Sequence, residues 1–211
     1  MTQPKLFSPL TLRGTTLRNR AVMSPMCQYQ AVEGRVQDWH FAHHARFAAG
    51  GLGAAFVEAT GVTRDGRITH GCTGIWDDGQ IPGLTRIAEL YRTYGTMPGI
   101  QIGHSGRRGS AARPWDGAAP LKETSGPEPA WERVGPSAIP ERDGYPAPRE
   151  LTIAEIEDLI DAFRRAVQRA LAAGFEILEI HGAHGYLVHS FFSPISNRRS
   201  DEFGGTLEKR M

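Results

Sequence analysis

The stretch LTIAEIEDLIDAFRRAVQRALAAGFEILEI (151–180) decides the fold, because it joins a capped amphipathic helix to a strand across one glycine. Thr152 and Glu155 have the T-x-x-E spacing of a capping box, which predicts that a helix begins there. Gly174 predicts where the helix ends, and FEILEI (175–180) predicts a buried strand. The apolar residues that recur at helical spacing are Ile153, Ile156, Leu159, Ile160, Phe163, Val167 and Leu171.

The same alternation of strand and helix runs back toward the N-terminus. Residues 21–26, 53–60 and 99–102 predict three further strands, with helices over 38–51 and 81–95 between them. The expected core-facing stripe of the first helix consists of Trp39, Phe41, Ala42, Ala45 and Ala48. Strict alternation of this kind argues for a parallel sheet covered by helices.

Two architectures fit a parallel sheet, a doubly wound sheet and a (β/α)₈ barrel. A dinucleotide-binding sheet needs G-x-G-x-x-G after its first strand, where this chain has SPMCQYQ (24–30). We therefore expect an α/β fold, a (β/α)₈ TIM barrel, with an N-terminal hairpin over 5–20. A full barrel takes about 250 residues. Residues 1–211 are then expected to form its N-terminal half, roughly four strand–helix units, with TLEKRM (206–211) starting another helix.

A long polar stretch, 104–149, is rich in Pro and Gly and interrupts the alternation. A loop of this length in a compact domain is usually a lid or a binding excursion, and we expect one here. Within it, HSGRRGS (104–110) could bind phosphate as a basic glycine-rich loop. A solvated turn is the favoured interpretation of that segment.

Composition excludes several classes of partner. The 211 residues carry a net charge of +1, which gives no reason to expect nucleic acid or an anionic membrane. No apolar run approaches the roughly 20 residues of a membrane helix, and the start MTQPKLFSPL lacks the apolar core of a signal peptide. Two cysteines are too few for a disulfide framework, so we expect a reducing, cytoplasmic location.

In barrels the chemistry lies at the C-terminal ends of the strands. Here those ends are Met26–Cys27, Glu58–Ala59, Gln101 and His181. Alternation along the last strand places His181 on the same face as Ile177 and Glu179, at the rim.

The segment EIHGAHGYLVHSFFSP (179–194) then brings His181, His184, Tyr186 and His189 within nine residues. Three interpretations are open: a zinc site using His189, caps for the following helix, or a ligand site. The third is favoured. Two imidazole N–H groups aimed at one carbonyl oxygen would stabilise negative charge there, and a tyrosine beside them could deliver a proton.

Other residues at the strand ends suit a pocket. Cys27 follows a Pro-containing strand end, so a functional role is as well supported as that of an apolar filler. Tyr29, two residues on, could point into the same pocket. Gln101 ends a strand in which Gln is unusual, and its amide both donates and accepts, as recognition of a flavin pyrimidine edge requires.

Motifs along nearly the whole chain resemble the Old Yellow Enzyme family of FMN-dependent ene-reductases, in its bacterial thermophilic-like branch. The most specific is EIHGAHGYLVHSFFSPISNRRSDEFGG (179–205). The others are SPMCQY (24–29), DWH (38–40), VEATGV (57–62), GRITHG (66–71), GIWDD (74–78), GIQIGHSGRR (99–108), GPSAIP (135–140) and PRELT (148–152).

The resemblance implies an FMN-binding barrel and an NADPH dehydrogenase activity. It implies hydride transfer from NADPH or NADH to FMN, then reduction of the activated C=C bond of an α,β-unsaturated carbonyl compound. His181 and His184 would hold the substrate carbonyl, Tyr29 would contact the substrate, and Tyr186 would donate the proton. Cys27 would also tune the flavin potential. The residues implied to contact FMN are Ser24, Pro25, Met26, Cys27, Ala59, Gln101 and His181.

Two positions and the length depart from the family pattern. Arg108 stands where the family usually has Lys, and Cys72 where an acidic or small residue is more common. Strands 5 to 8, with the arginine beside the ring and the phosphate site, are expected to be missing from the 211 residues. The alternatives are therefore a half-barrel without catalysis and a metal-dependent hydrolase. As partners we expect a small enone-type molecule and further copies of the chain, with no metal.

Overall fold

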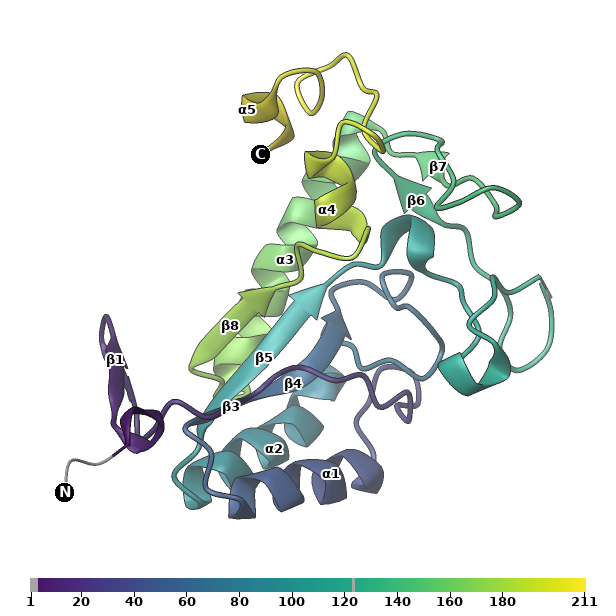
Figure 1. Ribbon diagram of the computed structural model, residues 1–211. Helices are drawn as coiled ribbons and strands as arrows, with labels where there is room; N and C mark the ends of the chain where they lie inside the picture. The colour runs from purple at the N-terminus through teal and green to yellow at the C-terminus, as the bar shows by residue number, and fades with distance from the viewer. Residues whose placement is uncertain (1–3, 123) are drawn as a thin grey trace.

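The computed structural model describes residues 4–122 and 124–211, so residues 1–3 and position 123 of the expected lid segment lie outside it. Its centre is a four-stranded parallel sheet in the order β3-β4-β5-β8 (Figure 1). The strands are β3 (Val22–Met23), β4 (Ala54–Gly61), β5 (Met97–Gly103) and β8 (Ile177–Ile180). Between them stand α1 (Asp38–Ala49), α2 (Ile81–Thr93) and α3 (Ile153–Ala172), which confirms the predicted alternation.

Shorter elements surround this sheet. The predicted N-terminal hairpin is present as an antiparallel pair that projects away from the sheet (Figure 1). The strands outside the sheet are β1 (Leu10–Leu12), β2 (Thr15–Leu17), β6 (Val134–Gly135) and β7 (Arg149–Glu150). The short helices are η1 (Lys5–Phe7), η2 (Asp78–Gln80), η3 (Gly106–Arg108), η4 (Pro114–Asp116), α4 (Leu187–Phe192) and α5 (Leu207–Arg210). None of the described helices is both long enough and apolar enough to span a bilayer.

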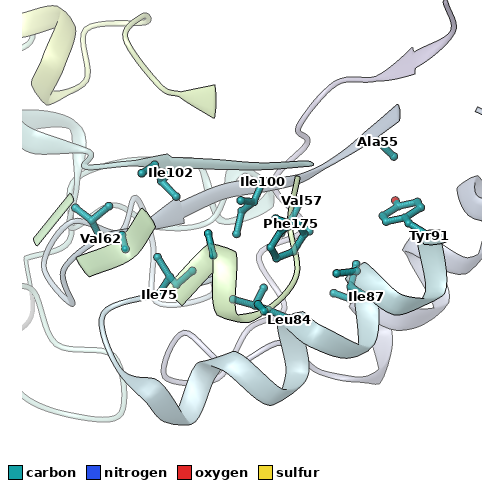
Figure 2. Close-up of a cluster of buried hydrophobic side chains, with 14 of the residues drawn as sticks. Ala55, Val57, Val62, Ile75, Leu84, Ile87, Tyr91, Ile100, Ile102 and Phe175 are labelled. Carbon is teal, nitrogen blue, oxygen red and sulfur yellow. The ribbon is translucent and has the colours of Figure 1, made fainter. Parts of the chain in front are cut away.

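One face of the sheet is closed by the three long helices. Figure 2 shows Val57 and Ile100 from the strands facing Leu84 and Ile87 of α2, with Phe175 beside them. All five side chains are buried. Burial of an aliphatic or Phe side chain of this size stabilises the fold by about 1.5–3 kcal/mol, so this face holds the sheet together.

The other face of the sheet has a different character. Gln101 pairs in register with Glu179, and Gly99 with Ile177, so these four residues share that face. A Cβ at Gly99 would touch the ring of Phe56, which places this ring on the same side. In a closed barrel this is the inward face, and Figure 1 shows the long helices on the opposite side.

The predicted apolar stripe of the first helix is wrong except at Ala48. The buried residues of α1 are His40, His44 and Ala48, while Trp39 is 57% exposed. The three buried positions are spaced four residues apart and face the sheet and α2. Both histidines can be buried because each has a partner far away in the sequence. Nδ1 of His44 lies 2.6 Å from the hydroxyl of Tyr91, for example.

The predicted stripe of the third helix is only partly right. Ile156 is buried in a second cluster, and the α3 residues that are buried in the main core are small: Ala162, Ala166 and Ala170. Leu171, by contrast, is 65% exposed. Alanines every four residues let α3 lie near the strands, while Phe163 and Val167 are only partly buried and pack against the same core.

The observed strand boundaries differ most from the predicted ones at the two edges of the sheet. Residues 21–26 contribute only β3 (Val22–Met23), and 175–180 only β8 (Ile177–Ile180). The expectation that 175–180 is buried is also wrong, because Ile180 is 55% exposed. Among the described residues each of these strands pairs with a neighbour on one side only, so fewer backbone bonds and side chains cover it.

The segment 104–110 is not a solvated turn. His104 and Ser105 are buried, and the Ser105 hydroxyl donates to the carbonyl of Arg67 at 2.7 Å. The rest of the excursion is held by long-range bonds as well. Arg107 donates to the carbonyl of Pro140 at 3.1 Å, and Arg133 to that of Gly109 at 2.8 Å.

Candidate active site

Three aromatic side chains meet just beyond the end of β8. The ring of His181 lies 5.1 Å from that of His184 and 4.6 Å from that of Tyr186, centroid to centroid. The His181 N–H donates to the carbonyl of Ile102 at 2.9 Å, which extends the strand ladder and fixes this histidine at the rim. His184 has a φ of +58°, an unfavourable value for a residue with a Cβ. The sequence-predicted trio is therefore brought together.

The protonation state of His181 follows from its surroundings. Its Nδ1 accepts a hydrogen bond from the N–H of Ala183 at 3.3 Å, which leaves the proton of the neutral ring on Nε2. Burial, and then the neighbouring His184, lower the pKa of His181. The ring is therefore neutral at pH 7 and offers one N–H donor from Nε2.

Tyr186 retains its proton. Burial is the main cause that raises the pKa of Tyr186 to about 12, followed by the nearby Cys27 thiol, while Arg108 opposes the shift. A phenol that stays protonated across the physiological range can act as a hydrogen-bond donor or a general acid.

The loop after β5 braces this segment. The N–H of Leu187 donates to the carbonyl of His104 at 3.0 Å. Gly106 has a φ of +58°, and a Cβ there would come within 3.1 Å of the Leu187 Cα, so both the conformation and the contact favour glycine. Arg108 donates to the carbonyl of His184, and its guanidinium carbon lies 5.4 Å from the Tyr186 ring.

Tyr29 faces Tyr186 across a cavity of about 170 Å³. Its ring makes an edge-on contact with Trp115 of the excursion, with centroids 5.7 Å apart. Burial raises the pKa of Tyr29, so this phenol is also protonated. The cavity walls that come from the excursion include Arg108, Glu141, Arg142 and Tyr145.

Cys27 lies on the same side. The backbone N–H of Ala59 donates to its sulfur, and its charge state influences both Tyr29 and Tyr186. Ala59 in turn lines a small neighbouring pocket together with His181 and Tyr186. Cys27, Ala59, His181, Tyr186 and Tyr29 thus surround one region at the ends of β3, β4 and β8.

The remaining residues predicted to contact FMN lie farther from the His181–Tyr186 contact. Gln101 is 7% exposed, and its Nε2 donates to Oε1 of Glu179 at 2.5 Å, a partner that the sequence analysis did not propose. Gln101 and Glu179 lie on the inward face, two residues below His181. Ser24 and Met26 are exposed and Pro25 is half-buried, on the segment between β3 and Cys27.

Sequence analysis missed a buried acid–imidazole pair beneath this region. Oε1 of Glu58 lies 3.3 Å from Nε2 of His40, and both side chains are buried. Nδ1 of His40 accepts from the Gln37 N–H at 3.0 Å, so the neutral ring carries its proton on Nε2, toward the carboxylate. Oε2 of Glu58 accepts from the backbone N–H of Gln28 at 3.0 Å.

The backbone N–H of Tyr29 also hydrogen-bonds Glu58. The pair therefore holds the chain between Cys27 and Tyr29, where Tyr29 has a φ of +56°. Burial raises the pKa of Glu58, while His40 and the two N–H groups oppose the shift. The signal in the sequence was one acid inside the apolar run AAFVEAT (54–60).

The polar groups on the inward face suit the flavin implied by the resemblance. The Gln101 amide uses one N–H for Glu179, which leaves its second N–H for an acceptor. Its Oε1 accepts no hydrogen bond within residues 4–122 and 124–211. This donor and acceptor match a planar ring with alternating carbonyl and N–H groups. For a metal, the described residues contain no group of three or more His, Cys, Asp or Glu placed to hold an ion.

Structural comparison defines the class of protein. The fold superposes on morphinone reductase with a TM-score of 0.82 at 28% identity, covering 99% of this chain and 56% of that one. It superposes on a 2-naphthoyl-CoA reductase complex with a TM-score of 0.85 at 27% identity, covering 98% of this chain and 31% of that one. These matches confirm the α/β fold predicted above, part of a TIM barrel of the Old Yellow Enzyme type.

The sequence then gives the family. The model described as the NADH:flavin oxidoreductase / NADH oxidase family matches residues 5–211, and the chain belongs to that family. FMN is the flavin of this family. The chain is 46% identical over 207 residues to an NADPH dehydrogenase of Geobacillus thermodenitrificans (strain NG80-2), covering 97% of this chain and 56% of the relative. The chain therefore spans about half the length of the curated relatives it matches.

Proposed function

We propose that these residues form the substrate half of an FMN-dependent ene-reductase, which takes hydride from NADPH or NADH and reduces the activated C=C bond of α,β-unsaturated carbonyl compounds. The observation that carries the proposal is the contact of His181 with His184 and with Tyr186, which lines the same cavity as Tyr29. Family membership and the NADPH dehydrogenase names of relatives support it.

The two histidines suit the carbonyl oxygen. His181 offers a neutral Nε2–H, and His184 lies beside it on a constrained backbone that Arg108 holds through the carbonyl. Two donors at one oxygen withdraw electron density from a conjugated alkene and stabilise the enolate charge that develops when the β-carbon receives hydride. Such donors should act on both binding and rate.

Tyr186 suits the α-carbon. Its phenol is protonated and lies against His181, so a substrate whose oxygen meets the histidines would present its alkene near this hydroxyl. Tyr29 lies on the far side of the cavity and would contact the body of the substrate.

Bound FMN would supply the hydride, and residues on the inward face would hold it. We assign the ring contacts to Ser24, Pro25, Met26, Cys27 and Ala59, the pyrimidine edge to Gln101, and a further contact to His181. Glu58 and His40 keep the Cys27–Tyr29 segment in position. The segment 104–149 acts as the lid of the substrate cavity, and a cytoplasmic homo-oligomer completes the proposal.

The test is reduction of 2-cyclohexenone with NADPH by protein reconstituted with FMN. We expect saturated ketone to form at the rate at which NADPH is consumed. His181→Ala should weaken the binding of phenolic ligands and the reduction rate together. Ketone formation at the background rate in flavin-loaded protein would refute the ene-reductase assignment and leave a half-barrel without catalysis. Hydrolysis that depends on added zinc would instead favour the metal-dependent alternative.

A further inference from the structure

The two cysteines of the chain lie together although 44 residues separate their segments. Both are free thiols, and each lies close enough to the other to shift its pKa. Cys27 is half-buried and Cys72 is fully buried. The pairing is absent from the ene-reductase chemistry proposed above, which uses Cys27 alone.

The backbone around the two thiols is packed closely enough to keep them adjacent. The N–H of Ala31 donates to the carbonyl of Gly71 at 2.8 Å. A Cβ at Gly71 would lie 2.2 Å from the carbonyl oxygen of Tyr29, so only glycine permits this approach of the two segments. The fold of the backbone therefore keeps the segments that carry Cys27 and Cys72 adjacent.

The environment of Cys72 favours the thiolate. The N–H of Thr69 donates to its sulfur at 3.4 Å, and the Thr69 hydroxyl lies 3.6 Å away. The Cys27 thiol and these groups lower the pKa of Cys72, although its burial works the other way. The neighbouring Cys72, and then burial, raise the pKa of Cys27. The pair therefore carries one negative charge more readily than two isolated buried thiols would.

We propose that Cys27 and Cys72 are a redox modification site, at which a hydroperoxide converts the two thiols into an intrachain disulfide. Cys27 is the more exposed sulfur and meets the oxidant. The Cys27 proton first passes to the Cys72 thiolate. The Cys27 thiolate so formed attacks one peroxide oxygen, the O–O bond breaks, and a sulfenic acid and, with a proton from solvent, an alcohol (or water, from hydrogen peroxide) form. The Cys72 thiol then attacks the sulfenic sulfur, the S–S bond forms, and the thiol proton leaves with the sulfenic hydroxyl as water. Two thiols are oxidised and one peroxide is reduced.

The linkage would change the site that Cys27 lines. The Cys27 sulfur would turn toward Cys72, and the region that Cys27 and Ala59 line would lose a thiol S–H group. A thiol reductant would restore the dithiol. This consequence for activity rests on the proposed function, whereas the disulfide itself does not.

The experiment treats the 211-residue chain with hydrogen peroxide, blocks the remaining thiols with N-ethylmaleimide, and maps tryptic peptides by mass spectrometry without reduction. We expect peptide 21–35 linked to peptide 68–86, both thiols lost together, a monomer on a non-reducing gel, and full reversal by dithiothreitol. Flavin and activity play no part in this measurement, so its failure would leave the proposed function standing.

Two variants separate the pair from a single reactive cysteine. In Cys72→Ser, Cys27 has no resolving thiol, so peroxide should add oxygen to peptide 21–35 instead of linking it. In Cys27→Ser, the buried Cys72 should resist both peroxide and maleimide while the chain stays folded. The proposal is wrong if the unmodified sequence gives oxygenated Cys27 with an intact Cys72, disulfides between chains, or no oxidation at all.

Discussion

The two faces of the sheet differ in what covers them and in what they do. The face toward the helices carries Val57 and Ile100, which are fully buried. The inward face carries Gln101 and Glu179, which bond to each other, and leads to His181 at the rim. Stability therefore comes mainly from one face and chemistry from the other, within strands that alternate between the two at every residue.

This division separates the effects that substitutions should have. A change on the helix-covered face should lower stability whether or not a ligand is present. A change at the rim or on the inward face should alter chemistry or binding and leave the fold nearly unchanged. Substitutions at comparable positions on the two faces can therefore support or contradict this division between stability and chemistry.

The largest expected effect is at the rim. Tyr186→Phe in FMN-loaded protein should slow reduction of a weakly activated enone by about 10²–10⁴-fold, the usual contribution of a positioned general acid. Oxidation of NADPH with a quinone, which needs no proton on carbon, should be nearly unchanged. Steady-state rates with the two acceptors make the comparison, and the free energy of unfolding should match that of the unmodified chain.

Tyr145→Phe is the control, because Tyr145 lines the same cavity but its hydroxyl lies 2.6 Å from Arg142 rather than beside the histidines. It should alter neither rate strongly. Equal losses with both acceptors for Tyr186→Phe would mean that Tyr186 positions the site and is not the proton donor.

The next effect concerns stability and compares one residue type on the two faces. Ile100→Ala, on the helix-covered face, should lower the free energy of unfolding by about 2–5 kcal/mol, since it leaves a cavity in a packed core. Ile177→Ala, on the inward face and half-buried, should cost only about 1 kcal/mol. Urea denaturation of the 211-residue chain measures both.

Equal losses in the free energy of unfolding for the two variants would contradict the proposed difference between the faces. They would show that the inward face is covered in solution, for example by a second copy of the chain. Sedimentation of the same samples would then show an oligomer that Ile177→Ala weakens and Ile100→Ala does not.

The same two faces show where sequence reasoning works. The third helix and its capping box, the four strands and their order of appearance were predictable because each depends on local spacing. The buried face of α1 was not, since His40 and His44 look polar until Glu58 and Tyr91 are known to meet them. Those partners come from other elements, and the fold alone brings them together.

The site divides in the same way. His181, His184 and Tyr186 are close in sequence, and their contact was predicted from one segment. The partners Glu179 and Cys72 come from other parts of the chain, and no local pattern links them to Gln101 and Cys27.

A smaller effect should appear only in acid and only on the helix-covered side. Burial, then His43 and His40, lower the pKa of His44 to about 3, so the folded chain keeps this ring neutral. The unfolded chain binds a proton near pH 6.5. The stability that His44 contributes is therefore present above about pH 6.5 and is lost progressively as the pH falls toward 3.

Measuring the free energy of unfolding between pH 7 and pH 4 tests this point. His44→Gln keeps an acceptor for Tyr91 but does not titrate, so its stability should depend less on pH. His43→Gln is the matched control, because His43 is only half-buried and should change the slope less. Identical slopes for His44→Gln and the unmodified chain would contradict the assignment of the neutral, buried ring.

The smallest expected effect is the difference between the affinities of the chain for FMN and for riboflavin, which should be close to zero. The inward face and rim offer contacts to the ring of FMN through Gln101, Ala59 and Cys27. In barrels, phosphate is usually bound by the loops after strands 7 and 8, and the sheet of the described residues has four strands. FMN and riboflavin differ only in the phosphate, so the 211-residue chain should bind both with about equal, weak affinity in a fluorescence titration.

Gln101→Ala should weaken the binding of both flavins equally, because it removes a contact that the two flavins share. If FMN bound much more tightly than riboflavin, the phosphate would have partners within these 211 residues. The loop at 104–110, with the half-buried Arg107 and Arg108, would then be the first place to seek them. Arg107→Ala would be expected to abolish the difference and to leave riboflavin binding unchanged.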